Sequence, residues 1–187
     1  MKKIALFGTS ADPPTAGHQA ILRWLSDRFD LVAVWASDNP LKSHQTPLEH
    51  RTKMLGLLIE EIDLPPNNIN LYEELSDRRT INSLEKAKQK WGSDVEYTVV
   101  IGSDLVRQIR RWYRIEELLP KVNVLVVPRP GYPIEINDLE ALRNIGRDVS
   151  VANLNAPAVS SSAYREKGDK DAVTPPVKDY IHREQLY

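Results

Sequence analysis

The chain has 187 residues, of which 41% are hydrophobic and 27% charged, with 25 Lys and Arg against 26 Asp and Glu. The absence of Cys excludes thiolate catalysis and Cys-based zinc sites, and the near-neutral charge argues against a nucleic-acid binder. The eight Gly form neither of the common Gly-rich phosphate loops, G-x-G-x-x-G and G-x-x-x-x-G-K-[ST]. No signal peptide or membrane-spanning stretch is recognisable, so we expect a soluble, cytoplasmic protein with one domain over residues 1–187.

Short apolar runs alternate along the chain with segments that have helical spacing. The runs predict strands at Ile4–Phe7, Leu31–Ala36, Ile69–Tyr72, Tyr97–Ile101, Val122–Val127 and Val149–Ala152. Apolar spacing predicts helices around Trp24, Leu58 and Leu84, and a Pro-initiated helix over Pro175–Leu186. The segment Pro128–Asp138 is expected to be a loop. This alternation predicts an α/β fold with a doubly wound, mostly parallel sheet and helices on both faces.

The loop after the first expected strand is the strongest candidate for a ligand site, because open parallel sheets bind ligands beyond the carboxyl ends of their strands. Thr15 and His18 lie three residues apart across Gly17, at the start of an expected helix. Both side chains can face one ligand there, and the free N–H groups of the helix favour an anion. Taken alone, the loop is also explained by Thr15 as a helix cap and His18 as a partly exposed polar residue.

Three further groups follow expected strands or open helices. Lys42 lies in the loop after the second run and could neutralise a phosphate, although a solvated Lys is the ordinary explanation. Asp104 follows a Gly at the end of a run and could accept ribose hydroxyls or simply complement a helix N-terminus. Ser161, Ser162 and Arg165 form a second candidate anion site, or a plain N-cap.

The run DPPTAGH resembles the signature of the nucleotidyltransferase superfamily, in which (H/T)-x-G-H follows the first strand of a Rossmann-like fold. Within it, the sequence is similar to the nicotinate-nucleotide adenylyltransferases, whose opening loop reads like GG[ST]FDPPHxGH. Thr9, Ala11 and Thr15 depart from that pattern. The family's P-x-K, G-[SA]-D and S-S-x-x-x-R motifs and its LY ending occur here in the family's order, at Pro40–Lys42, Gly102–Asp104, Ser160–Arg165 and Leu186–Tyr187.

The resemblance implies roles for individual residues. His18 would contact the phosphates at the reacting centre with Thr15 beside it, while Arg165 and Lys42 would hold the two substrates. The implied ATP-binding residues are Gly8, Thr9, Ser10, Gly17, His18, Gly102, Asp104, Ser161, Ser162 and Arg165. Those implied for the mononucleotide are Asp12, Lys42, Thr80 and Trp112, whose ring would stack on the pyridine. Arg78 or Arg79 would favour a carboxylate on that ring, and Arg51 would support the site indirectly.

The implied reaction is the transfer of AMP from ATP to nicotinate mononucleotide, giving a dinucleotide and pyrophosphate in NAD biosynthesis. Nicotinamide mononucleotide stays open as a second acceptor. Mg²⁺ would accompany ATP, and no dedicated metal ligands are predicted. The alternatives are another nucleotidyltransferase, such as phosphopantetheine adenylyltransferase, and a non-catalytic nucleotide-binding module. We expect no nucleic acid or membrane as partner; a homo-oligomer is compatible with the sequence, but nothing in it marks an interface.

Overall fold

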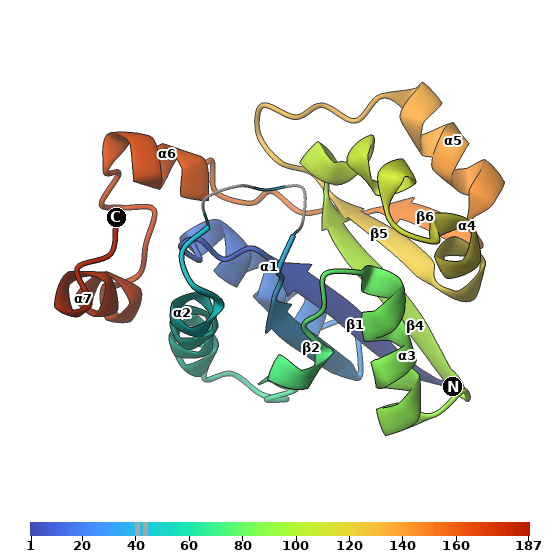
Figure 1. Cartoon of the computed structure of the whole chain (residues 1–187), viewed down its shortest axis with the longest axis horizontal. Helices are drawn as coiled ribbons and strands as arrows, with labels where there is room; N and C mark the ends of the chain where they lie inside the picture. Colours follow the sequence, from blue (N-terminus) through green and yellow to red (C-terminus); the bar gives the residue numbers. More distant parts are fainter. Residues whose placement is uncertain (40–41, 43–44) are drawn as a thin grey trace.

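The computed structural model describes residues 1–39, 42 and 45–187, and its centre is a six-stranded sheet (Figure 1). The strands are β1 (Lys2–Thr9), β2 (Leu31–Ala36), β3 (Ile69–Leu71), β4 (Val95–Gly102), β5 (Asn123–Val127) and β6 (Asp148–Val151). They lie in the order β3-β2-β1-β4-β5-β6, and every neighbouring pair is parallel. The order reverses beside β1, so the carboxyl ends of β1 and β4 border the crevice where such sheets bind ligands.

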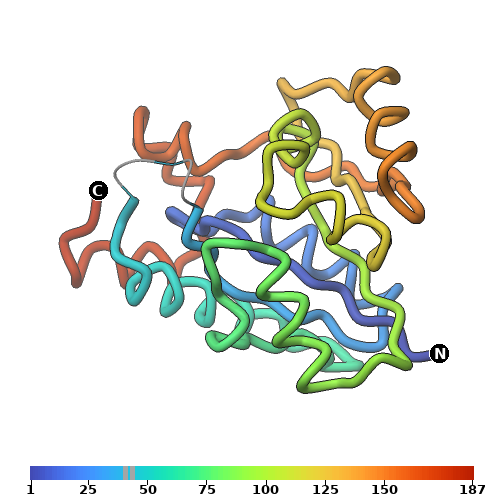
Figure 2. Tube along the Cα trace, turned by 45° about the vertical axis from the view of Figure 1, so that its right-hand side comes forward, coloured from blue at the N-terminus to red at the C-terminus, as the bar shows by residue number. Residues whose placement is uncertain are grey.

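Helices cover both faces of the sheet, as the sequence predicts. The α-helices are α1 (Ala16–Ser26), α2 (Leu48–Glu60), α3 (Thr80–Trp91), α4 (Ile115–Leu118), α5 (Ile136–Ile145), α6 (Ser161–Lys167) and α7 (Pro175–Arg183). Short 3₁₀ turns occupy Glu73–Leu75, Ser103–Leu105, Gln108–Arg111 and Leu119–Lys121. The trace in Figure 2 shows the C-terminal helices on the same side of the molecule as α2, against which α7 packs, and away from α5.

The apolar runs alternate between two cores because successive side chains of a strand point to opposite faces. Ile4 and Leu6 of β1 pack in one core with residues of α3, α4 and α5. Ala5 and Phe7 pack in the other, with residues of α1, α2 and α7. All six residues of β2 are buried, which explains why its sequence is continuously apolar instead of alternating.

The structure corrects two expected boundaries. The segment Pro128–Asp138 is not a loop throughout, because α5 already begins at Ile136, where Leu139 and Leu142 supply a buried helical stripe. The last helix ends at Arg183, before the expected Leu186. In the part of the chain that the structure describes, no helix is long and apolar enough to cross a membrane.

Candidate active site

The loop between β1 and α1 places Thr15 and His18 against each other at the start of α1. Thr15 is the N-cap of α1 and is 1% exposed, and its hydroxyl accepts a hydrogen bond from the N–H of Gly17. The backbone N–H of Thr15 donates to Nδ1 of His18 over 2.9 Å. This is a capping box in which a His takes the place usually held by Glu or Gln. The two residues therefore fix each other, and the helix-cap interpretation of Thr15 is correct.

The contacts of His18 define its protonation state. Because Nδ1 accepts from a backbone N–H, the neutral ring carries its proton on Nε2, which lies 3.0 Å from the hydroxyl oxygen of Thr9. Burial, with the positive charges of Arg129 and Lys42, lowers the pKa of His18 from 6.5 to about 4. His18 is thus a neutral hydrogen-bond donor at pH 7, with its Nε2–H beyond the carboxyl end of β1.

Lys42 reaches this loop from the segment after β2. Its ammonium donates to the hydroxyl of Ser10 over 2.9 Å. Desolvation lowers the pKa of Lys42, opposed by Asp104, and the nearby charges of Arg165 and Arg129 lower it further. The electrostatic neighbours of Lys42 thus come from the segments that follow β4 and β5 and from α6. Pro40 and Leu41 of the P-x-K motif lie outside the described residues.

Helix α6 approaches the same loop from the C-terminal half of the chain. Ser160 caps α6 by accepting from the N–H of Ala163, and Ser161 donates its hydroxyl to the carbonyl of Pro13 over 2.7 Å. Arg165 donates to the carbonyl of Asp12 over 2.7 Å and to the hydroxyl of Ser162 over 3.3 Å. The structure therefore brings the expected Ser-rich helix start together with the DPPTAGH loop.

Asp104 and Arg129 form an ion pair beyond the ends of β4 and β5. Asp104 lies in the 3₁₀ turn after Gly102, and its carboxylate accepts from a guanidinium nitrogen of Arg129 over 2.9 Å. The backbone N–H of Arg129 also donates to the hydroxyl of Ser103. The sequence reasoning missed Arg129, whose charge acts on both His18 and Lys42. The sequence feature that could have indicated Arg129 was its position two residues after the end of β5.

Two of the predicted glycines lie in tightly packed places. A Cβ on Gly8 would lie 2.5 Å from Nε1 of Trp35, and a Cβ on Gly102 would lie 2.5 Å from a carboxylate oxygen of Asp104. Gly17 is less confined, since the nearest atom to such a Cβ is the hydroxyl oxygen of Thr15 at 3.3 Å. Gly8 and Gly102 thus let side chains of this protein approach the backbone at the two strand ends that border the site.

The buried guanidinium of Arg51 fixes the backbone of the β1–α1 loop. Arg51 of α2 is 2% exposed and donates to the carbonyls of Ser10, Ser37 and Thr46 over 3.0, 2.6 and 2.7 Å. Asp12 is 5% exposed, and its carboxylate accepts from the N–H of Thr46 over 3.2 Å. Burial lowers the pKa of Arg51, and the negative charge of Asp12 opposes that shift. Both residues fix backbone positions, which agrees with the indirect role expected for Arg51.

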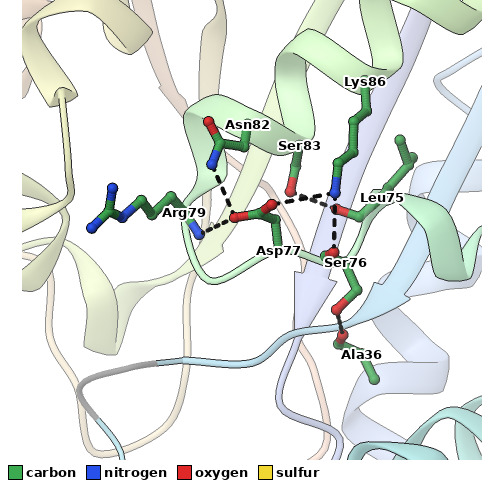
Figure 3. A network of polar contacts seen from close by, with 8 residues as sticks. All are labelled: Ala36, Leu75, Ser76, Asp77, Arg79, Asn82, Ser83 and Lys86. Carbon is green, nitrogen blue, oxygen red and sulfur yellow. Dashed lines mark hydrogen bonds and ion pairs between the residues drawn. The ribbon is translucent and has the colours of Figure 1, made fainter.

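The start of α3 is organised by a separate polar network around Asp77 (Figure 3). Its carboxylate accepts from the N–H of Arg79, the side-chain amide of Asn82 and the ammonium of Lys86 over 2.9, 3.2 and 3.2 Å. Burial alone would raise the pKa of Asp77, but these three donors hold it below its ordinary value. Ser76 extends the network to β2 by donating to the carbonyl of Ala36 over 2.7 Å.

Thr80 and Trp112, two of the four residues expected to contact the mononucleotide, lie apart from the phosphate-facing residues in the hydrogen-bond network. Thr80 is the first residue of α3, and Trp112 is partly buried against the core beneath α3 and α4. Within the described residues, neither side chain forms a hydrogen bond with His18, Lys42 or Arg165. Trp112 is half-buried, so its ring is partly open to solvent.

Arg79 and Tyr113 extend this second region toward solvent. The guanidinium carbon of Arg79 lies 3.8 Å from the centre of the Tyr113 ring. Both side chains are exposed, Tyr113 to 48%. Arg78 instead lies 3.8 Å from the carboxylate of Asp38. Of the two Arg residues considered from the sequence, only Arg79 is held beside the chain segment that contains Trp112.

The described part of the chain is poor in side chains arranged to bind a metal ion. In residues 1–39, 42 and 45–187, no group of three or more His, Asp or Glu side chains could hold a metal ion. Asp12 and Asp104 are the carboxylates nearest the cations, and each is already engaged with protein donors. This donor set fits a cation that is carried mainly by a nucleotide and water, rather than by a protein cage.

Comparison with known proteins gives consistent matches. The "Cytidylyltransferase-like" family model matches residues 6–167. A probable nicotinate-nucleotide adenylyltransferase from Synechocystis sp. is 46% identical and aligns with 99% of this chain and 98% of its own length. One from Bacillus cytotoxicus is 31% identical over 100% of this chain and 99% of its own length.

A solved structure shares the fold. Plasmodium falciparum nicotinic acid mononucleotide adenylyltransferase complexed with NaAD superimposes with a TM-score of 0.84 and 22% identity, over 100% of this chain and 98% of that chain. This confirms the Rossmann-like architecture that the sequence resemblance predicts. The family match and the curated relatives confirm the resemblance itself. The chain therefore belongs to the cytidylyltransferase-like family, in its nicotinate-nucleotide adenylyltransferase branch.

Proposed function

We propose that this protein is an adenylyltransferase that joins ATP and nicotinate mononucleotide. A phosphate oxygen of the mononucleotide attacks the α-phosphorus of ATP and forms the new phosphoanhydride bond. The bond from that phosphorus to the β-phosphate oxygen breaks, and pyrophosphate leaves with the electron pair. The observation that carries the proposal is the convergence of Lys42, Arg129, Arg165 and the donor Nε2–H of His18 at the β1–α1 loop.

His18 stabilises the charge that develops on the transferred phosphate. Its Nε2–H, which donates to Thr9 in the free protein, donates to a phosphate oxygen when ATP is bound. The capping box with Thr15 fixes the ring beforehand, so little reorganisation accompanies the reaction. The attacking phosphate oxygen is already anionic, so no general base is required, and a neutral His18 is sufficient.

The positively charged side chains hold the two substrates so that the attacking oxygen, the phosphorus and the leaving oxygen are in line. Arg165, with Ser161 and Ser162, binds the β- and γ-phosphates of ATP together with Gly8, Thr9, Ser10 and Gly17 of the first loop. Lys42 binds the phosphate of the mononucleotide, and Arg129 adds positive charge between them. In phosphoryl-type transfer, such positioning and charge stabilisation account for most of the catalysis.

The remaining predicted residues bind the sugars and the pyridine. Asp104, beside Gly102, accepts the adenosine ribose hydroxyls and exchanges its bond to Arg129 for them. Thr80 and Trp112 contact the pyridine ring, and Arg79 is poised near them to attract its carboxylate. Asp12 acts on the mononucleotide indirectly, since its carboxylate is buried and engaged with Thr46.

Nucleotidyltransferases of this type generally use a divalent metal with ATP. We infer Mg²⁺ here, which would neutralise phosphate oxygens and keep water ligands. The single domain over 1–187, the cytoplasmic location and the absence of nucleic-acid and membrane partners stay predictions, and a homo-oligomer stays open.

The deciding experiment supplies Mg-ATP with one acceptor at a time and measures pyrophosphate release. The acceptors are nicotinate mononucleotide, nicotinamide mononucleotide and phosphopantetheine. We expect the fastest release with nicotinate mononucleotide. A preference for phosphopantetheine would overturn the substrate assignment, and no release with any acceptor would indicate a non-catalytic nucleotide-binding module.

A further inference from the structure

Tyr187 reaches back from the C-terminal segment to the loop that begins the proposed site. Its hydroxyl donates to the second carboxylate oxygen of Asp12, the one that Thr46 does not occupy. Its ring meets the ring of Tyr164 edge-on, with centroids 5.9 Å apart. The side chain is 48% exposed, so this contact connects a surface residue to a carboxylate that is only 5% exposed.

Asp12 joins the two segments that present the phosphate-facing side chains. Its carboxylate accepts from the N–H of Thr46, at the end of the segment that carries Lys42. Its carbonyl accepts from Arg165, so the backbone of the β1–α1 loop and helix α6 are held together at the same residue. Asp12 is therefore hydrogen-bonded both to Thr46 and to Arg165.

Tyr187 contacts Asp12 and also the neighbour of Arg165, the two ends of the Asp12–Arg165 hydrogen bond. The phenol fixes the carboxylate directly, and the ring contact with Tyr164 restrains the residue that precedes Arg165. A hydrogen bond to a charged acceptor is stronger than one between neutral groups, which suits a contact near the surface. We propose that Tyr187 is a positioning residue, which fixes Thr46 and Arg165 beside the phosphate site through Asp12 and Tyr164.

The chain offers a matched control in the same C-terminal segment. Tyr180 of α7 also uses its hydroxyl in a hydrogen bond, 2.8 Å from Nδ1 of His50, and it is 7% exposed. Tyr187→Phe and Tyr180→Phe each remove one phenol oxygen and keep the ring. A general loss of stability would affect both variants, whereas a positioning role is specific to Tyr187.

The first test is amide hydrogen exchange of the ligand-free protein, which is independent of turnover. In Tyr187→Phe we expect the N–H of Thr46 and the amides of the β1–α1 loop to exchange at least about 10-fold faster than in the wild type. In Tyr180→Phe these rates should stay unchanged. Equal rates in Tyr187→Phe and the wild type would overturn the proposal, and so would equal acceleration in both variants.

The second test is kinetic and rests on the proposed function. With Mg-ATP and nicotinate mononucleotide, we expect Tyr187→Phe to lower kcat/KM about 10-fold, and Tyr180→Phe to lower it less than 2-fold at a temperature where both are folded. In an Asp12→Ala background the additional effect of Tyr187→Phe should vanish. A persistent effect in that background, or an effect no larger than that of the control, would overturn the positioning role. An inactive wild type would overturn the proposed function. The exchange rates would still test the positioning role of Tyr187.

Discussion

Two regions of this molecule border the proposed site, and they are held by different chemical means. The β1–α1 loop is held by Arg51 and Arg165, which donate hydrogen bonds to its backbone carbonyls. The start of α3 is organised by one carboxylate, that of Asp77, which collects donors from Arg79, Asn82 and Lys86. In the first region, side chains from outside the loop fix the main chain of the loop. In the second region, the hydrogen bonds lie within one chain segment around the start of α3.

The difference indicates how the two regions respond to substitution. Backbone carbonyls accept hydrogen bonds whatever side chain is attached to them. The first region can therefore contain Thr9, Ala11 and Thr15, which depart from the family pattern, without losing these hydrogen bonds. In the second region, the side chain of Arg79 is exposed and stacked on Tyr113. We infer that the phosphate chemistry depends on the first region and the choice of acceptor on the second.

Removing His18 should produce the largest effect. We expect His18→Ala to lower kcat about 10²–10³-fold, because a preorganised donor to the developing charge is lost. The control is His50→Ala, which removes a His that contacts Tyr180 outside the site. Steady-state pyrophosphate release from both variants decides the point, and unchanged turnover in His18→Ala would remove this residue from the mechanism.

Arg51→Met tests the carbonyl-held region through stability. Three carbonyls lose their donor, so we expect the free energy of unfolding to fall by about 2–4 kcal/mol. The same change at exposed Arg78, which lies 3.8 Å from Asp38, should cost under about 1 kcal/mol. Urea unfolding of the two variants measures both values, and similar losses would contradict the comparison.

The protonation of His18 gives a pH dependence. Its pKa falls from 6.5 to about 4 on folding, so the unfolded chain binds more protons between these values. The stability contribution is fully present above pH 6.5 and is lost as the pH falls toward 4. NMR titration of the imidazole should give a midpoint near 4, which Lys42→Met should raise because a nearby cation is removed. A midpoint near 6.5 in the wild type would contradict the described environment.

The smallest expected effect concerns the choice of acceptor. We expect Arg79→Gln to reduce the preference for nicotinate over nicotinamide mononucleotide about 3–10-fold, since a surface charge contributes about 1 kcal/mol. Arg78→Gln should leave the ratio within about 2-fold, because Arg78 lies against Asp38. The ratio of the two kcat/KM values measures this. An equal change in both variants would mean that charge near the site, and not the position of Arg79, sets the preference.

Most of the fold could be predicted from the sequence because buried parallel strands are continuous apolar runs. The start of α5 could not, since Pro130, Gly131 and Pro133 obscure the stripe made by Leu139 and Leu142. Helix α5 lies on the edge of the sheet, over β6, which has only one buried residue. Weak burial leaves a weak pattern, so boundaries there are harder to predict.

The residues of the candidate site also differ in how well the sequence predicts them. His18, Lys42 and Arg165 follow strands or open helices, where local sequence already favours ligand contacts. Arg51 could only be assigned an indirect role, because its partners are carbonyls that the fold brings together. Arg129 was missed because it lies in the segment predicted as a loop, although that segment begins at the carboxyl end of β5.

Arg51 also has a practical consequence for redesign. By holding the carbonyls of Ser37 and Thr46, it defines fixed attachment points for the intervening residues 38–45. A loop grafted between these two residues would keep both carbonyl contacts to Arg51, but it would have to carry a Lys in the place of Lys42, whose ammonium donates to Ser10.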